Sequence, residues 1–147
     1  MIKISATLPG ERREPGQLFL EIDGERHGPI ACLGKADQER ADKAGNPARD
    51  PILPYGDTPT GVYRAAKLVH HVPPHARVGE WFLPLVGRSG EAFDAMAART
   101  AVGIHAGRGN DRLVPTYGCL RVSDDDMAEM AAIINGREVD EIVILEV

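Results

Sequence analysis

Cysteine is scarce in this sequence, with only Cys32 and Cys119 among 147 residues. Two cysteines are too few for a disulfide scaffold, which points to a packed core as the source of stability. Long apolar runs are also missing: no stretch of about 18 apolar residues occurs, which excludes a membrane-spanning helix. The first eight residues lack the apolar stretch and cleavage site of a signal peptide, so export by the general secretory route is not expected.

An excess of positive charge is absent as well. The formal net charge is −5, so no basic surface argues for a nucleic acid or an anionic membrane as partner. Hydrophobic residues make up 43% and charged residues 27% of the chain, as in an ordinary globular protein. The length fits one domain covering residues 1–147, and we find no internal repeat, low-complexity tract or second domain.

Alternating apolar residues, β-branched residues and turn signals predict a set of short strands. Asp23-Gly24 is the best hairpin signal among the turns. Residues 35–50 are expected to form a surface loop or a short helix, and residues 92–98 one or two helical turns. The predicted strands cover residues 2–8, 17–22, 28–33, 61–68, 81–86 and 141–147.

A single longer helix is predicted to begin at Asp124. Ser123 can cap its N-terminus, and three consecutive aspartates from Asp124 place negative charge where the helix dipole favours it. Apolar residues follow at helical spacing, and Gly136 supplies a stop. Many strands with one helix indicate a mainly β fold, either a β-sandwich or an open barrel.

The chemistry of the chain is expected around one His and one Cys, His105 and Cys119, fourteen positions apart. A thiolate is a strong nucleophile, and it needs a base or a cation nearby to form at neutral pH. Such a pair is a candidate catalytic site if the fold brings the two side chains together. Gly118 has no Cβ, so the backbone before the Cys can adopt a positive φ or let a substrate approach closely.

The pattern Ile-His-Ala-Gly followed by Thr-Tyr-Gly-Cys-Leu-Arg resembles the signature of the L,D-transpeptidase catalytic domain, or YkuD, family. Residues 57–63, Asp-Thr-Pro-Thr-Gly-Val-Tyr, are similar to an upstream Thr-Pro-x-Gly-x-aromatic strand of that family. The resemblance spans roughly residues 30–125. It departs from the family at Tyr117, where many members have a second His. The spacer between His105 and Cys119 is also at the short end of the family's range. It implies a β-sandwich with a helix after the Cys strand.

Residue chemistry and the resemblance together predict the catalytic roles. Cys119 is the expected nucleophile, and His105 would take its proton or form a thiolate–imidazolium pair with it. The resemblance implies that a backbone carbonyl near Ala106 orients the imidazole. The backbone N–H groups of Gly118 and Cys119 are expected to donate hydrogen bonds to the oxyanion.

Four further residues are predicted to contact substrate: Arg121, Tyr117, Thr116 and Gly107. Arg121 would bind a substrate carboxylate or, alternatively, support the Cys strand. Tyr117 is expected to shape the pocket, because strand alternation would give it one face with Cys119 and Arg121.

The remaining candidates favour structural interpretations. Cys32 is expected to be buried, and a disulfide to Cys119 would consume the nucleophile. His70, His71 and His75 invite a metal site, but Pro73-Pro74 prevents the helical geometry of zinc helices, so they are predicted to be loop histidines. Asp124, Asp125 and Asp126 lack the glycine and the spaced carboxylates of an EF-hand calcium loop, so a capped helix start is favoured over a calcium site. No metal or organic cofactor is expected.

The resemblance implies acyl transfer on peptidoglycan stem peptides, as an L,D-transpeptidase that makes cross-links or exchanges D-amino acids. With water as acceptor, the same site would make an L,D-carboxypeptidase or a cell-wall-targeting effector toxin. A binding module for peptidoglycan that has lost activity is a further alternative. The substrate implies action in the periplasm or cell wall, after non-classical export, and an export machinery or an immunity protein would be a partner.

Overall fold

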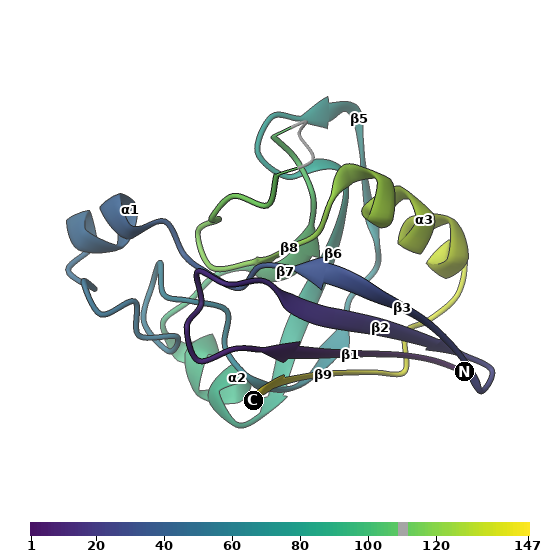
Figure 1. Ribbon diagram of the computed structural model, residues 1–147, viewed down its shortest axis with the longest axis horizontal. Coiled ribbons are helices and arrows are strands. Elements are labelled where there is room, and N and C mark those ends of the chain that lie inside the picture. Colours follow the sequence, from purple (N-terminus) through teal and green to yellow (C-terminus); the bar gives the residue numbers. More distant parts are fainter. Residues whose placement is uncertain (109–111) are drawn as a thin grey trace.

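The computed structural model describes residues 1–108 and 112–147, and these are mainly β (Figure 1). Apart from the three-residue 3-10 turn Ala95–Ala97, the elements follow one another as β1 (Ile2–Leu8), β2 (Gly16–Ile22), β3 (Glu25–Cys32), α1 (Gln38–Lys43), β4 (Gly61–Ala65), β5 (Val69–His75), β6 (Gly79–Ser89), α2 (Glu91–Asp94), β7 (Val102–His105), β8 (Leu120–Arg121), α3 (Asp124–Ile134) and β9 (Glu141–Glu146). The predicted fold class, mainly β with a helix after the Cys strand, is confirmed.

The strands form one sheet that curls until its ends meet. The order is β3-β2-β1-β9-β4-β6-β7-β8, with β5 added to β6. Leu33 directly follows β3, and its N–H donates to the carbonyl of Arg121 in β8 at 2.9 Å, while the Arg121 N–H donates back at 3.0 Å. This bridge nearly closes the barrel and fixes the position of the Cys119 segment.

The core lies between the sheet and α3. In β1 every second side chain is buried, as its alternating sequence predicts, and it pairs in parallel with β9 from the other end of the chain. Ser123 caps α3, because its Oγ accepts from the N–H of Asp126 at 3.1 Å. The helix lies across one side of the sheet (Figure 1), and its buried residues are Met127, Met130, Ala131 and Ile134.

Two expectations are wrong in detail. His70, His71 and His75 lie in strand β5 and not in a loop. Cys119 precedes β8, and residues 117–119 form bends because Gly118 has φ 116°, so strand alternation does not describe this segment. In the described part of the chain, no helix has the length and apolar character needed to cross a membrane.

Candidate active site

His105 and Cys119 line the same cavity, which has a volume of about 960 Å³. The cause is the parallel pairing of β7 with β8, which sets Ile104 beside Leu120 and His105 beside Arg121. Cys119 comes one residue before β8, and the backbone of Gly103 in β7 acts to lower the pKa of its thiol. The fold therefore brings together the two side chains that the sequence predicts as a pair.

The His105 ring is held in one tautomer. Its Nδ1 lies 2.6 Å from the carbonyl oxygen of Ala106, which is the backbone contact that the resemblance implies. A carbonyl only accepts hydrogen bonds, so Nδ1 carries the hydrogen and Nε2 keeps a free electron pair. Burial lowers the pKa of His105 to about 4, with the cations Arg121 and Arg77 and the nearby His75 adding to the effect. The imidazole is therefore neutral at neutral pH and able to accept a proton.

Arg121 fixes the carbonyl that orients His105. Its Nη1 donates to the carbonyl oxygens of Ala106 at 2.6 Å and Gly107 at 2.9 Å, and its Nε donates to that of Val114 at 2.7 Å. The residue is 3% exposed. Of the two roles predicted for Arg121, this geometry favours support of the site over capture of a substrate carboxylate.

Cys119 is partly exposed toward the cavity, yet its surroundings raise the pKa of the thiol through burial. The Gly103 amide and the cations Arg99 and Arg121 oppose this rise. Both shifts favour the neutral forms, a thiol at Cys119 and an imidazole at His105, in the one cavity that the two side chains line. Cys32 is also a free thiol, but it is fully buried and burial raises its pKa to about 12, so it should be inert.

The backbone before Cys119 forms a tight bend that needs glycine. Gly118 has φ 116°, and a Cβ there would lie 1.7 Å from Nη2 of Arg99 and 2.6 Å from the carbonyl oxygen of Gly56. Thr116 ties the bend together, because its Oγ1 donates to the Cys119 carbonyl at 2.8 Å and accepts from the Gly118 N–H at 2.9 Å. The Gly118 amide is therefore occupied, which is a correction to its predicted role as oxyanion donor. Of the two amides predicted as oxyanion donors, the Cys119 amide is the one that remains a candidate.

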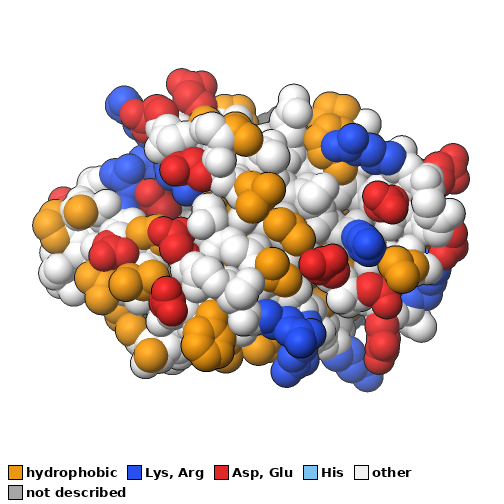
Figure 2. Space-filling view, turned by 90° about the horizontal axis from the view of Figure 1, so that it is seen from below, with side chains coloured by type: hydrophobic (Ala, Val, Ile, Leu, Met, Phe, Trp, Pro, Cys, Tyr) orange, Lys and Arg blue, Asp and Glu red, His pale blue; other side chains and the backbone are white. Residues whose placement is uncertain are grey.

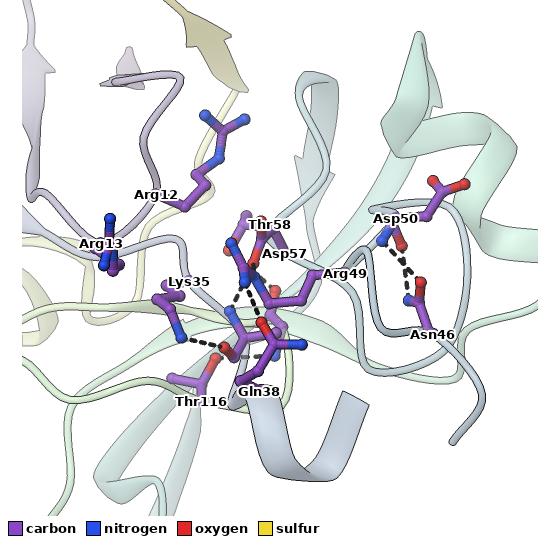
Figure 3. Close-up of polar contacts among 12 residues, drawn as sticks. Arg12, Arg13, Lys35, Gln38, Asn46, Arg49, Asp50, Asp57, Thr58 and Thr116 are labelled. Carbon is purple, nitrogen blue, oxygen red and sulfur yellow. Dashed lines mark hydrogen bonds and ion pairs between the residues drawn. The ribbon is translucent and has the colours of Figure 1, made fainter. Parts of the chain in front are cut away.

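The segment of residues 57–63 that carries the Thr-Pro-x-Gly pattern supports the same bend through a side-chain hydrogen bond. Thr58 is fully buried, and its Oγ1 donates to the Gly118 carbonyl at 3.0 Å. Next to it, Asp57 pairs with Nε of Arg49 at 3.0 Å and accepts from the N–H of Ala36 at 2.8 Å. Figure 3 shows Thr58, Asp57 and Arg49 near Thr116. The segment thus acts on the Cys bend through hydrogen bonds.

Arg99 lines the candidate site, although no sequence pattern pointed to it. Its Nη1 donates to the carbonyl oxygens of Pro51 at 2.7 Å and Asp57 at 2.9 Å, and its Nη2 to that of Tyr117 at 3.4 Å. It lines the cavity and its charge acts on Cys119. These partners lie far from it in sequence, so only the fold reveals the contact.

The other predicted substrate residues divide between two places. Tyr117 is 42% exposed and lines the cavity with Cys119, although a bend and not a strand puts it there. Thr116 also lines it, but its hydroxyl is used within the bend. Gly107 lines a neighbouring cavity of about 430 Å³ instead, so the structure does not bring it to Cys119.

The histidines of β5 take separate roles. His70 stacks on Trp81 with ring centroids 3.9 Å apart and contacts Glu80, whereas His71 and His75 line the cavity of Cys119. Within residues 1–108 and 112–147, no three His, Cys, Asp or Glu side chains are grouped as metal ligands would be.

No family model and no curated protein match the sequence, so membership of the YkuD family stays a prediction. Solved structures do match. Bd1075 of Bdellovibrio bacteriovorus has a TM-score of 0.59 at 16% identity, over 96% of this chain and 47% of its own. Pgp2 of Campylobacter jejuni, a helical cell shape determining protein, has a TM-score of 0.56 at 10% identity, over 99% and 48%.

An L,D-transpeptidase from Mycobacterium smegmatis aligns over 97% of this chain and 58% of its own at 11% identity, but its TM-score of 0.45 is too low to establish a shared fold. The similarity to Bd1075 and Pgp2 establishes the fold alone. This chain spans about half the length of those two proteins.

Proposed function

We propose that this chain is a cysteine acyltransferase that acts on peptidoglycan stem peptides as an L,D-transpeptidase. The observation that carries the proposal is the placement of Cys119 in one cavity with His105, whose Nδ1–H is bound to a backbone carbonyl. A neutral imidazole with a free Nε2 is the base that a neutral thiol requires.

In the first step, the sulfur of Cys119 attacks the carbonyl carbon before the terminal D-amino acid while its proton passes to Nε2 of His105. The Cys119 amide stabilises the resulting oxyanion. When the tetrahedral intermediate collapses, the carbon–nitrogen bond breaks and His105 returns the proton to the leaving amine. The products are a free D-amino acid and a thioester on Cys119.

In the second step, an acceptor amine attacks the thioester carbonyl. The amine gives a proton to His105, the carbon–sulfur bond breaks, and the proton returns to the thiolate. A stem-peptide amine would yield a cross-link and a D-amino acid would yield exchange, whereas water would make the protein an L,D-carboxypeptidase.

The fold supports a role at the cell wall. Pgp2, which shares the fold, is a helical cell shape determining protein, although its identity to this chain is only 10%. We place the activity of this chain in the periplasm or cell wall, because its proposed substrate lies there.

The test is mass spectrometry of the intact protein and of muropeptides after incubation with tetrapeptide stems. We expect a thioester adduct on wild-type protein and new muropeptides, and neither from Cys119→Ala. Cys32→Ala is the matched control, because it removes the other thiol and should leave both signals unchanged. The muropeptide masses distinguish cross-linking, exchange and trimming. An unmodified wild-type protein with unchanged muropeptides would leave only the binding-module alternative.

A further inference from the structure

The cavity that holds Cys119 is cationic in a protein whose net charge is −5. Arginines and histidines from several elements line it, and none of the described lining residues is acidic. The face of the molecule in Figure 2 differs, because acidic, basic and apolar side chains are interspersed on it. The arginines that line the cavity are Arg40, Arg77, Arg99, Arg108 and Arg121.

Two of these arginines end a row of stacked side chains at the cavity. The guanidinium carbon of Arg40 lies 4.2 Å from the ring centroid of Tyr55. Tyr55 meets Tyr117 edge-on, with centroids 5.6 Å apart, and the guanidinium carbon of Arg77 lies 5.0 Å from the Tyr117 ring. We call these four residues the Arg–Tyr row. It joins α1, the loop before β4, the Cys bend and the β5–β6 turn.

The backbone is arranged to hold the row in place. Tyr55 has φ 62°, a left-handed conformation that is uncommon for a bulky side chain. Such a conformation persists only where the surrounding structure enforces it, and residues in it cluster at functional sites. Nη2 of Arg40 also donates to the Tyr55 hydroxyl at 2.9 Å, which orients the guanidinium.

The guanidiniums of the row differ from those of Arg99 and Arg121, which also line the cavity. Arg99 and Arg121 already donate to backbone carbonyls. For Arg40 and Arg77, no carboxylate of residues 1–108 or 112–147 lies within ion-pairing distance. Stacking on a ring leaves the edge donors of a guanidinium free to bind a carboxylate in a forked pair.

We infer that the Arg–Tyr row is a carboxylate-recognition wall that selects acyl donors with free carboxylates over amidated ones. The inference rests on the proposed function, since it specifies which form of the stem peptide reaches Cys119. Arg40 and Arg77 each pair with one carboxylate of the donor, and the two tyrosines hold the guanidiniums in position by stacking. Amidation removes the negative charge, so the amidated stem loses both pairs.

The experiment measures binding to Cys119→Ala, which cannot turn the ligand over. The probes are L-alanyl-γ-D-glutamyl-meso-diaminopimelyl-D-alanine with free carboxylates and the same peptide with its glutamyl and diaminopimelyl carboxylates as carboxamides. We expect the free peptide to bind about 25-fold more tightly, which is the product of about fivefold for each of the two exposed ion pairs. Arg40→Gln and Arg77→Gln, each combined with Cys119→Ala, should each lower that ratio by about fivefold.

Arg64→Gln is the matched control, because Arg64 is an exposed arginine of β4 that does not line the cavity. It should leave the ratio unchanged. Equal affinity for the two peptides, no binding of either, or a ratio that Arg40→Gln and Arg77→Gln do not alter would overturn the inference. The proposed function is judged separately by the thioester on wild-type protein, so selective binding without a thioester would refute that function and leave the recognition wall standing.

Discussion

At the scale of single residues, the candidate site combines an imidazole and a thiol whose surroundings both favour the neutral form. This arrangement makes the reactivity of Cys119 depend on His105 in a way that pH can reveal. His105→Ala should slow the alkylation of Cys119 by a small thiol reagent at neutral pH, because no base remains to take the proton. At high pH the thiol ionises unaided, so the two proteins should react at similar rates.

The measurement is the rate of adduct formation across pH, followed by intact mass. Cys32 contributes no background in the folded protein, since it is fully buried and its pKa is raised to about 12. Equal rates for wild type and His105→Ala at every pH would remove His105 from the mechanism.

Tyr117 permits a second prediction at this scale. The proposed mechanism needs only one base, and His105 supplies it. Tyr117→Phe should therefore keep most of the rate and lose at most one hydrogen bond, about 0.5–1.5 kcal/mol. Tyr117→Ala also removes the ring that contacts Tyr55 and Arg77, so it should mainly raise KM. Steady-state kinetics on a tetrapeptide stem separate the two effects, and a thousandfold fall in kcat for Tyr117→Phe would show that the phenol transfers a proton.

At the scale of elements, regular patterns gave correct predictions and irregular segments did not. β1, β9 and α3 follow clear periodicities that reflect one buried face, so the sequence reveals them. β5 has two prolines and almost no buried side chain, because it pairs only with β6 at the edge of the sheet. Such a strand carries no alternation to detect.

The candidate site shows the same limit. His105 and Cys119 could be predicted because their residue types and spacing carry the chemistry. The contributions of Arg99 and Thr58 depend on contacts between segments distant in sequence, such as the 60 positions between Thr58 and Gly118. The occupied amide of Gly118 could not be predicted either, since it follows from the side-chain orientation of Thr116.

The Cys bend is the element whose support can be tested directly. Thr58→Val keeps the side-chain shape but leaves the buried Gly118 carbonyl without its donor. We expect the free energy of unfolding to fall by about 1–3 kcal/mol, and the alkylation of Cys119 to change with it. Chemical denaturation and the alkylation assay measure the two effects.

Thr60→Val is the control for that prediction. Thr60 Oγ1 donates to Glu91 at 2.9 Å and does not contact the Cys bend. Thr60→Val should therefore lower stability without altering alkylation of Cys119. If Thr60→Val and Thr58→Val change the alkylation rate equally, the effect comes from general loosening of the fold and not from the bend.

At the scale of the whole molecule, the nearly closed sheet links the candidate pair His105 and Cys119 to the stability of the fold. Arg121 closes the barrel through its backbone pairing with Leu33 and fixes the carbonyl of Ala106 through its side chain. The same residue thus connects the two ends of the sheet and the orientation of His105. Burial of His105 in this position should make the stability of the protein depend on pH.

The last prediction concerns that dependence. The pKa of His105 is about 4 in the folded protein and 6.5 in its reference state, so the unfolded chain binds the proton more readily. The stabilisation is complete above pH 6.5 and is lost as pH falls toward 4. The difference in unfolding free energy between wild type and His105→Gln should be constant above about pH 7 and shift by about 3 kcal/mol against wild type near pH 4. Because the comparison uses the difference between the two unfolding free energies, the contributions of groups that titrate alike in both proteins cancel. Denaturant titrations at stepped pH provide the measurement, and a difference that does not change with pH would show that His105 is not held neutral by burial.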